Sequence, residues 1–179
     1  MFRLFGRTAN TAVIDRLYLA VVAASRRQAL YVDFHIPDTF EGRFESLSLH
    51  AVLLLRRLQA CESPGPDMAQ HLVDTVFKHF DRTLRELGVG DTVVPKRMKT
   101  MAEAFLGRSS AYDAALRDDG DGLAAALGRN VYNRGSDAFA LARYVEASAR
   151  ALEQTPLQAL IDGTVPFPDP SIFATEITP

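Results

Sequence analysis

Residues 67–88, DMAQHLVDTVFKHFDRTLRELG, show a clear helical pattern from which the fold can be predicted. Its large apolar side chains follow one another at gaps of one, three or four residues, which places them on one side of a helix. We expect Asp67 to cap this helix after the breaker at residues 63–66, SPGP, and Gly88 to close it. The apolar stripe consists of Met68, Leu72, Val73, Val76, Phe77, Phe80, Leu84 and Leu87.

The same helical spacing continues upstream and downstream of this stretch, and strand-like alternation is hard to find. The sequence therefore predicts an all-α fold, a single-domain helical bundle of about six helices. Pro95 fits the first turn of the next helix, and Asp137 is expected to cap a later one. A very apolar helix after the turn at residues 37–42 is expected to be central. The other helices are predicted at residues 11–32, 123–133, 138–154 and near 157–161, within a domain at 11–162 between an N-terminal tail at 1–10 and an extended C-terminal tail at 163–179.

The amino-acid composition limits the classes of protein to which this chain can belong. The chain has 179 residues, 47% of them hydrophobic and 23% charged, which is typical of one globular domain and excludes wholesale disorder. Its 20 basic and 22 acidic residues are too balanced for a protein that coats DNA by bulk charge. The single Cys61 cannot form an intrachain disulfide, so a reducing compartment fits best.

The sequence offers no apolar run of membrane-spanning length and no secretory signal at its start. We therefore expect a cytoplasmic protein. The first seven residues, MFRLFGR, combine Phe2, Leu4 and Phe5 with two arginines. This pattern allows a peripheral contact with the inner face of the cytoplasmic membrane.

The sequence contains no motif that is typical of an enzyme active site. The four histidines lack the spacing of metal ligands, and neither a dinucleotide fingerprint nor a nucleophile elbow is present. We therefore expect no metal, no cofactor and no enzymatic activity. An all-α enzyme remains an alternative, and it would need a polar constellation inside the bundle, such as His50 with Asp81 and Arg82.

Charge is unevenly distributed along the chain. Residues 82–108 contain six basic and three acidic side chains, whereas residues 146–179 contain one basic and five acidic ones. The first turns of a predicted helix contain Lys96, Arg97 and Lys99, where positive charge opposes the helix macrodipole. A role in binding is therefore a simpler explanation for these cations than helix stability. A solvated helix surface and a ribosome-binding or nucleic-acid-binding module are the alternatives. The predicted partner-binding residues are Arg82, Arg85, Asp91, Lys96, Arg97, Met98, Lys99, Met101 and Arg108.

Three segments resemble the signatures of the ubiquinol–cytochrome c chaperone family. The opening signature is residues 37–45, PDTFEGRFE, with LH at 49–50 and LRRL at 55–58. The central signature is residues 81–91, DRTLRELGVGD, with KRMKTMAEAFLGR at 96–108, and the closing one is RNVY at 129–132. Within these segments we assign structural roles to Asp38, Gly42, Arg43, Glu45, His50, Asp81, Gly88, Gly90 and Asn130.

The resemblance implies an assembly chaperone. Members of the family, mitochondrial and bacterial, are needed to assemble the cytochrome bc1 complex, and mitochondrial members hold newly made cytochrome b and engage the ribosome. The expected partner is therefore cytochrome b or a bc1 assembly intermediate, bound through the basic helix-turn-helix surface. We also expect Asp38 and Asp91 to tie down their loops, with Arg43 and Arg82 as their respective partners.

Overall fold

The computed structural model describes residues 7–118, 122–132 and 138–174. Within these ranges every regular element is a helix and no strand is present, which confirms the all-α prediction. The Asp137 cap, the proposed membrane contact of residues 1–6 and the ends of both tails lie outside the described residues. The helices are α1 (Arg7–Ser25), α2 (Gln28–Val32), α3 (Phe40–Gln59), α4 (Gly65–Glu86), α5 (Val94–Arg117), α6 (Gly122–Val131), α7 (Phe139–Gln154), α8 (Leu157–Ile161) and α9 (Ser171–Ala174).

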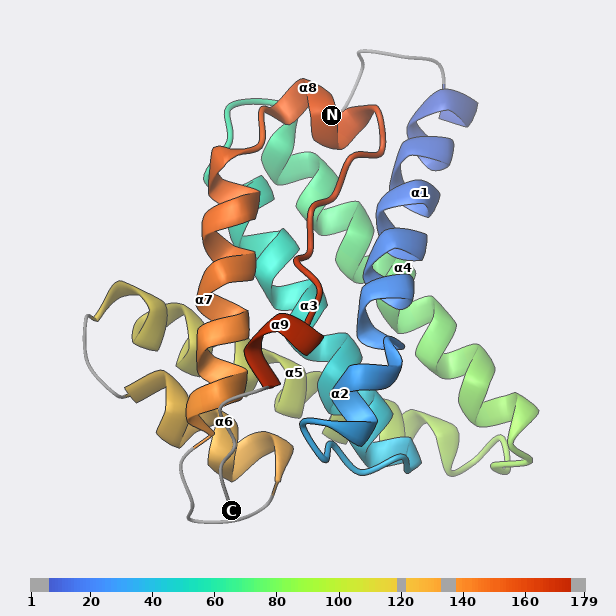
Figure 1. The fold of residues 1–179 in the computed structure, drawn as a ribbon. Coiled ribbons are helices and arrows are strands. Elements are labelled where there is room, and N and C mark those ends of the chain that lie inside the picture. The colour runs from blue at the N-terminus through green and yellow to red at the C-terminus, as the bar shows by residue number, and fades with distance from the viewer. Residues whose placement is uncertain (1–6, 119–121, 133–137, 175–179) are drawn as a thin grey trace.

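Helix α3 is the centre of the molecule, as predicted. It lies between α7 on one side and α1 with α4 on the other (Figure 1), and it also contacts α5 and α6. Of its 20 residues, 13 are buried, including its middle stretch from Ser48 to Leu55. A helix that is apolar almost all round is stable only when other helices cover every side of it.

Helix α4 buries most of the stripe from which the fold is predicted, but the prediction is wrong for Leu87, which follows the last turn of the helix and is 63% exposed. Met68, Leu72 and Val76 are completely buried, and Phe80 and Leu84 continue the contact toward the end of the helix. The helix begins at Gly65, so the prediction that Asp67 caps it is wrong. The helix instead begins directly after Pro64. Pro66 fits the first turn because a proline nitrogen carries no hydrogen and therefore needs no hydrogen-bond acceptor.

The prediction of one helix over residues 11–32 is wrong, because α1 ends at Ser25 and α2 begins at Gln28. The carbonyl oxygen of Ser25 accepts hydrogen bonds from two side chains, the hydroxyls of Tyr31 at 2.7 Å and Ser46 at 2.8 Å. Arg27 takes an extended conformation with φ −60° and ψ 130°. The two hydroxyls thus occupy the carbonyl that a continuing helix would use for its own backbone bond.

The segment at residues 162–170 descends from α8 to α9 between α7 and α1 (Figure 1). Phe167 is 6% exposed and meets the ring of His50 edge-on, with 5.0 Å between the ring centroids. The guanidinium of Arg27 donates a hydrogen bond to the carbonyl of Pro168. This segment is non-helical as predicted, but it covers the core rather than extending away from it, and the predicted extended tail is wrong where α9 forms.

Candidate partner-binding site

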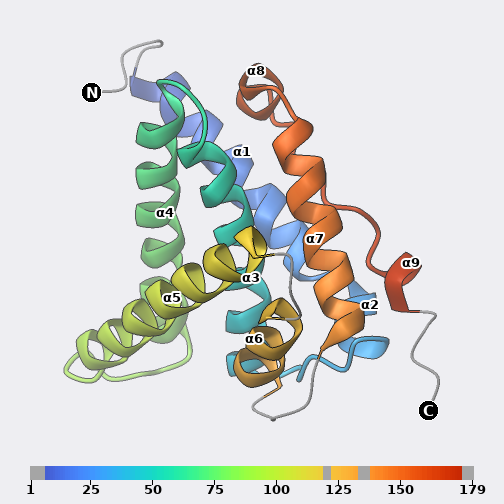
Figure 2. The same ribbon diagram turned by 90° about the vertical axis from the view of Figure 1, so that its left-hand side faces the viewer.

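The end of α4, the turn at residues 87–93 and the first turns of α5 form one exposed basic surface. We call it the basic turn surface and define it by five exposed cations. Helix α5 runs obliquely across α4 and α3, so the turn lies at one edge of the molecule (Figure 2). As predicted, cations lie on both sides of the turn. They are Arg82 and Arg85 on α4, and Lys96, Arg97 and Lys99 on α5.

Backbone hydrogen bonds fix the shape of the turn. Gly88 has φ +78°, the left-handed conformation of a residue that closes a helix, which confirms its predicted role. The amide of Val89 donates to the carbonyl of Leu84 at 3.1 Å, and the amides of Val93 and Val94 donate to Gly90 at 2.8 and 3.1 Å. Val94 is fully buried, so the turn is anchored to the core.

Three of the five cations are paired with carboxylates. Arg82 contacts Glu86 at 2.7 Å, and Lys99 lies 3.8 Å from Glu103. Arg85 lies 2.7 Å from Asp81 and 2.5 Å from Asp91. The bond from Arg85 holds the pKa of Asp81 below its usual range.

The prediction that Arg82 is the partner of Asp91 is wrong. Asp91 pairs with Arg85, which also binds Asp81 and so ties the turn to the last turns of α4. Arg82 instead pairs with Glu86, one helical turn further along the same helix. Arg85 therefore stabilises the turn and is less available to a partner than the sequence alone indicates.

Lys96 and Arg97 are the most available cations of the basic turn surface. Both are exposed, and neither has a carboxylate within ion-pair distance among the described residues. They lie in the first turn of α5, whose dipole repels positive charge. Leu87 and Val93, which are 63% and 45% exposed, add apolar surface beside them.

Met101 and Arg108 do not present free side chains to a partner. Met101 is 8% exposed and packs in the core, because it lies on the face of α5 that also buries Phe105 and Tyr112. Arg108 donates two hydrogen bonds to Glu45 on α3, at 2.7 and 3.0 Å. Met98 is half-buried against the core.

The Glu45–Arg108 pair is structural. The Glu45 side chain is 10% exposed and that of Arg108 is 22% exposed, so the pair joins α3 to α5 away from most solvent. Beside it, burial raises the pKa of Tyr112 well above its usual range, and Glu45 adds to that effect. Asn130 on α6 lies near the same hydroxyl. Glu45 and Asn130, which are both predicted to have structural roles, thus lie at the junction of α3, α5 and α6.

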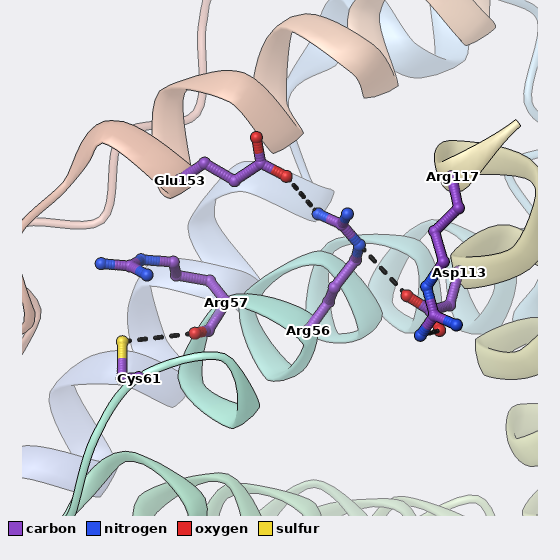
Figure 3. Close-up of polar contacts among 6 residues, drawn as sticks. All are labelled: Arg56, Arg57, Cys61, Asp113, Arg117 and Glu153. Atoms are coloured by element: carbon purple, nitrogen blue, oxygen red, sulfur yellow. Dashed lines mark hydrogen bonds and ion pairs between the residues drawn. The ribbon is translucent and has the colours of Figure 1, made fainter. Parts of the chain in front are cut away.

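A second polar network joins the other end of α3 to α5 and α7 (Figure 3). Arg56 donates to Asp113 on α5 at 3.1 Å and also pairs with Glu153 on α7. Arg57 donates to the carbonyl of Thr155 at 2.8 Å. Arg56 and Arg57, two of the three arginines of the opening signature, therefore link helices of the bundle.

His50 is completely buried in the core. Its Nδ1 lies 2.7 Å from the carbonyl oxygen of Ser46, and its Nε2 lies 2.7 Å from the hydroxyl of Tyr144. Desolvation lowers the pKa of His50 to about 4, against the opposing effect of the Ser46 bond. The ring is therefore neutral at pH 7. Neither Asp81 nor Arg82 contacts it, so the polar constellation considered for an enzyme is not formed.

The loop before α3 is closed by two short-range contacts. Asp38 and Arg43 pair at 2.6 Å, as predicted, and this bond lowers the pKa of the carboxyl group. A Cβ atom at Gly42 would lie 1.9 Å from the carbonyl oxygen of Pro37. Only glycine permits this close approach of the loop to the first turn of α3.

Comparisons with known proteins identify the family. Residues 32–167 match the model of the ubiquinol-cytochrome C chaperone family. The chain belongs to this family. The segment matched extends from the end of α2 to the buried Phe167, so it includes the basic turn surface, both polar networks and the covering C-terminal segment.

Similar proteins include ubiquinol-cytochrome c reductase complex assembly factor 1 of mouse and human, which are 28% and 29% identical over 119 residues. The matches cover 66% of this chain and 40% of each relative, so this chain corresponds to less than half of those proteins. The Drosophila melanogaster factor is 27% identical over 154 residues, 81% of this chain and 60% of its own length. The crystal structure of the Cbp3 homolog from Brucella abortus is 41% identical, with a TM-score of 0.82, covering 92% of this chain and 93% of that one.

Within residues 7–118, 122–132 and 138–174, no helix is long and apolar enough to cross a bilayer. No three His, Cys, Asp or Glu side chains gather there in a way that could hold a metal ion.

Proposed function

We propose that this chain assists assembly of the cytochrome bc1 complex by binding newly made cytochrome b through the basic turn surface, without catalysing a reaction. Membership of the family and the names of the related assembly factors support the first part. The observation that supports the second part is that Lys96 and Arg97, at the start of α5, form no ion pair with any residue that the structure describes.

Lys96 and Arg97 destabilise the helix on which they lie. Each cation near the N-terminus of a helix destabilises it by roughly 0.3–1 kcal/mol, and no carboxylate among the described residues offsets Lys96 or Arg97. An acidic segment of a partner would relieve this repulsion on binding. The exposed Leu87 and Val93 would contact apolar residues that flank the acidic ones.

The test is charge reversal at both positions, K96E with R97E, in cells that lack the native copy of the protein. We expect the double variant to unfold at the same or a higher temperature, because acidic side chains favour a helix N-terminus. We expect the amount of assembled bc1 complex, measured on native gels, to fall to the level of cells without the protein.

A matched control reverses two cations elsewhere on the surface. Lys78 on α4 and Arg129 on α6 are exposed and unpaired among the described residues. K78E with R129E makes the same change of net charge and should leave assembly intact. Normal assembly in the K96E/R97E cells would mean that the basic turn surface is only a solvated surface. Recovery of ribosomes instead of cytochrome b, with steep salt dependence, would favour the ribosome-binding alternative.

A further inference from the structure

A groove of about 390 Å³ lies beside the basic turn surface and is separate from Lys96 and Arg97. Its walls come from the end of α1, from α2, from the loop and first turns of α3, and from the second half of α4. The opening signature supplies much of this lining, through residues 38–40 and 43–44. These residues therefore line the groove as well as closing the loop before α3.

The lining is aromatic and incompletely buried. Tyr18 on α1 stacks on His79 of α4, with ring centroids 4.1 Å apart and an angle of 12° between the planes. Phe40 and Leu47 are also partly exposed, and Leu87 at the edge is 63% exposed. Concave apolar surface of this kind and volume is typical of a binding pocket.

The rim of the groove carries net positive charge. Arg26 is exposed at the junction of α1 and α2 and has no carboxylate partner among the described residues. It lies close enough to Tyr18 and Tyr31 to oppose the rise in the pKa of each that burial produces. The second rim arginine, Arg43, is already neutralised by Asp38. Arg26 is therefore the charge that an incoming group would meet.

We propose that this groove binds an amphipathic helical segment of a partner protein, which inserts apolar side chains and places a carboxylate against Arg26. The volume suits about two or three large side chains, the number that one helix face presents at spacings of three and four residues. Charge complementarity favours an acidic segment over a basic one. The proposal does not depend on the identity of the partner of the basic turn surface.

The experiment uses the whole protein and a phage-displayed library of helical peptides. We expect the enriched peptides to share apolar residues at spacings of three and four with an acidic residue one turn away. Synthetic copies of these peptides, followed by fluorescence anisotropy, should bind R26E and T83W at least about tenfold more weakly than the unaltered protein. Thr83 is exposed on α4 and lines the groove, so tryptophan there fills the groove without disturbing the core.

Two controls separate this site from its neighbour. R26K should retain binding, and K96E/R97E should bind the peptides as tightly as the unaltered protein while failing to support assembly. Failure to enrich any peptide, enrichment of basic peptides, or binding unchanged by T83W would overturn the proposal. Self-association of the protein, or binding to anionic lipid vesicles, that T83W abolishes would assign the groove to a second copy or to lipid and would equally overturn it.

Discussion

Lowering the pH tests the buried environment of His50 directly. In the unfolded chain its pKa is close to the ordinary value of about 6.5, whereas desolvation lowers the pKa in the folded protein to about 4. Between these two values the unfolded state binds a proton that the folded state does not. The free energy of unfolding must therefore fall as the pH falls through this window, and it is unaffected by His50 above it.

The size of the effect follows from the two pKa values. A tenfold difference in proton affinity corresponds to about 1.4 kcal/mol, so His50 alone should remove about 3 kcal/mol of stability between pH 6.5 and pH 4. The bonds from Arg43 and Arg85 lower the pKa values of Asp38 and Asp81, and this effect is the same in the unaltered protein and in a variant at position 50.

The assay is urea unfolding, followed by circular dichroism at several pH values from 7.5 to 4.5, on the unaltered protein and on His50→Gln. The unaltered protein should lose stability more steeply than the variant, because only the former gains a proton at this position on unfolding. A parallel measurement follows the imidazole resonances by NMR, which needs no variant. Equal slopes for the two proteins, or a His50 resonance that titrates near pH 6.5, would refute the reasoning.

Two further predictions concern the contacts that hold α3. Gly42→Ala should lower the free energy of unfolding by at least about 2 kcal/mol, because its Cβ atom would collide with the backbone. Gly90→Ala is the control and should cause no such loss, because the space around Gly90 is open. Equal urea midpoints for the two variants would contradict this. Glu45→Ala should cost about 2–3 kcal/mol because it leaves Arg108 partly buried without its carboxylate. Glu103→Ala, which removes an exposed carboxylate, is the control, and an equal loss from both would show that burial is irrelevant.

Local spacing was enough to predict most of the helices. The stripe of α4 and the glycine that closes it depend on neighbours three or four residues away, and the structure confirms the stripe as far as Leu84 and the role of the glycine. The break between α1 and α2 could not be predicted in this way. It depends on a hydroxyl from Ser46, 21 residues beyond the carbonyl of Ser25 that it binds.

The candidate site was predicted in outline but not in its internal pairing. Charge counting located the basic turn surface, yet it could not tell that Arg85 binds both Asp81 and Asp91. The groove was missed because Tyr18 and His79 come from different helices and carry no shared spacing in the sequence. Contacts of that kind depend on how the helices pack, which helical periodicity does not specify.

The proposed function requires that Lys96 and Arg97 bind cytochrome b. The most direct measurement compares how much newly made cytochrome b is recovered with the unaltered protein, with K96E/R97E and with K78E/R129E, from cells that contain equal amounts of each. We expect equal recovery with the unaltered protein and the control, and loss of recovery with K96E/R97E. Recovery of cytochrome b with K96E/R97E at the level of the control would contradict it.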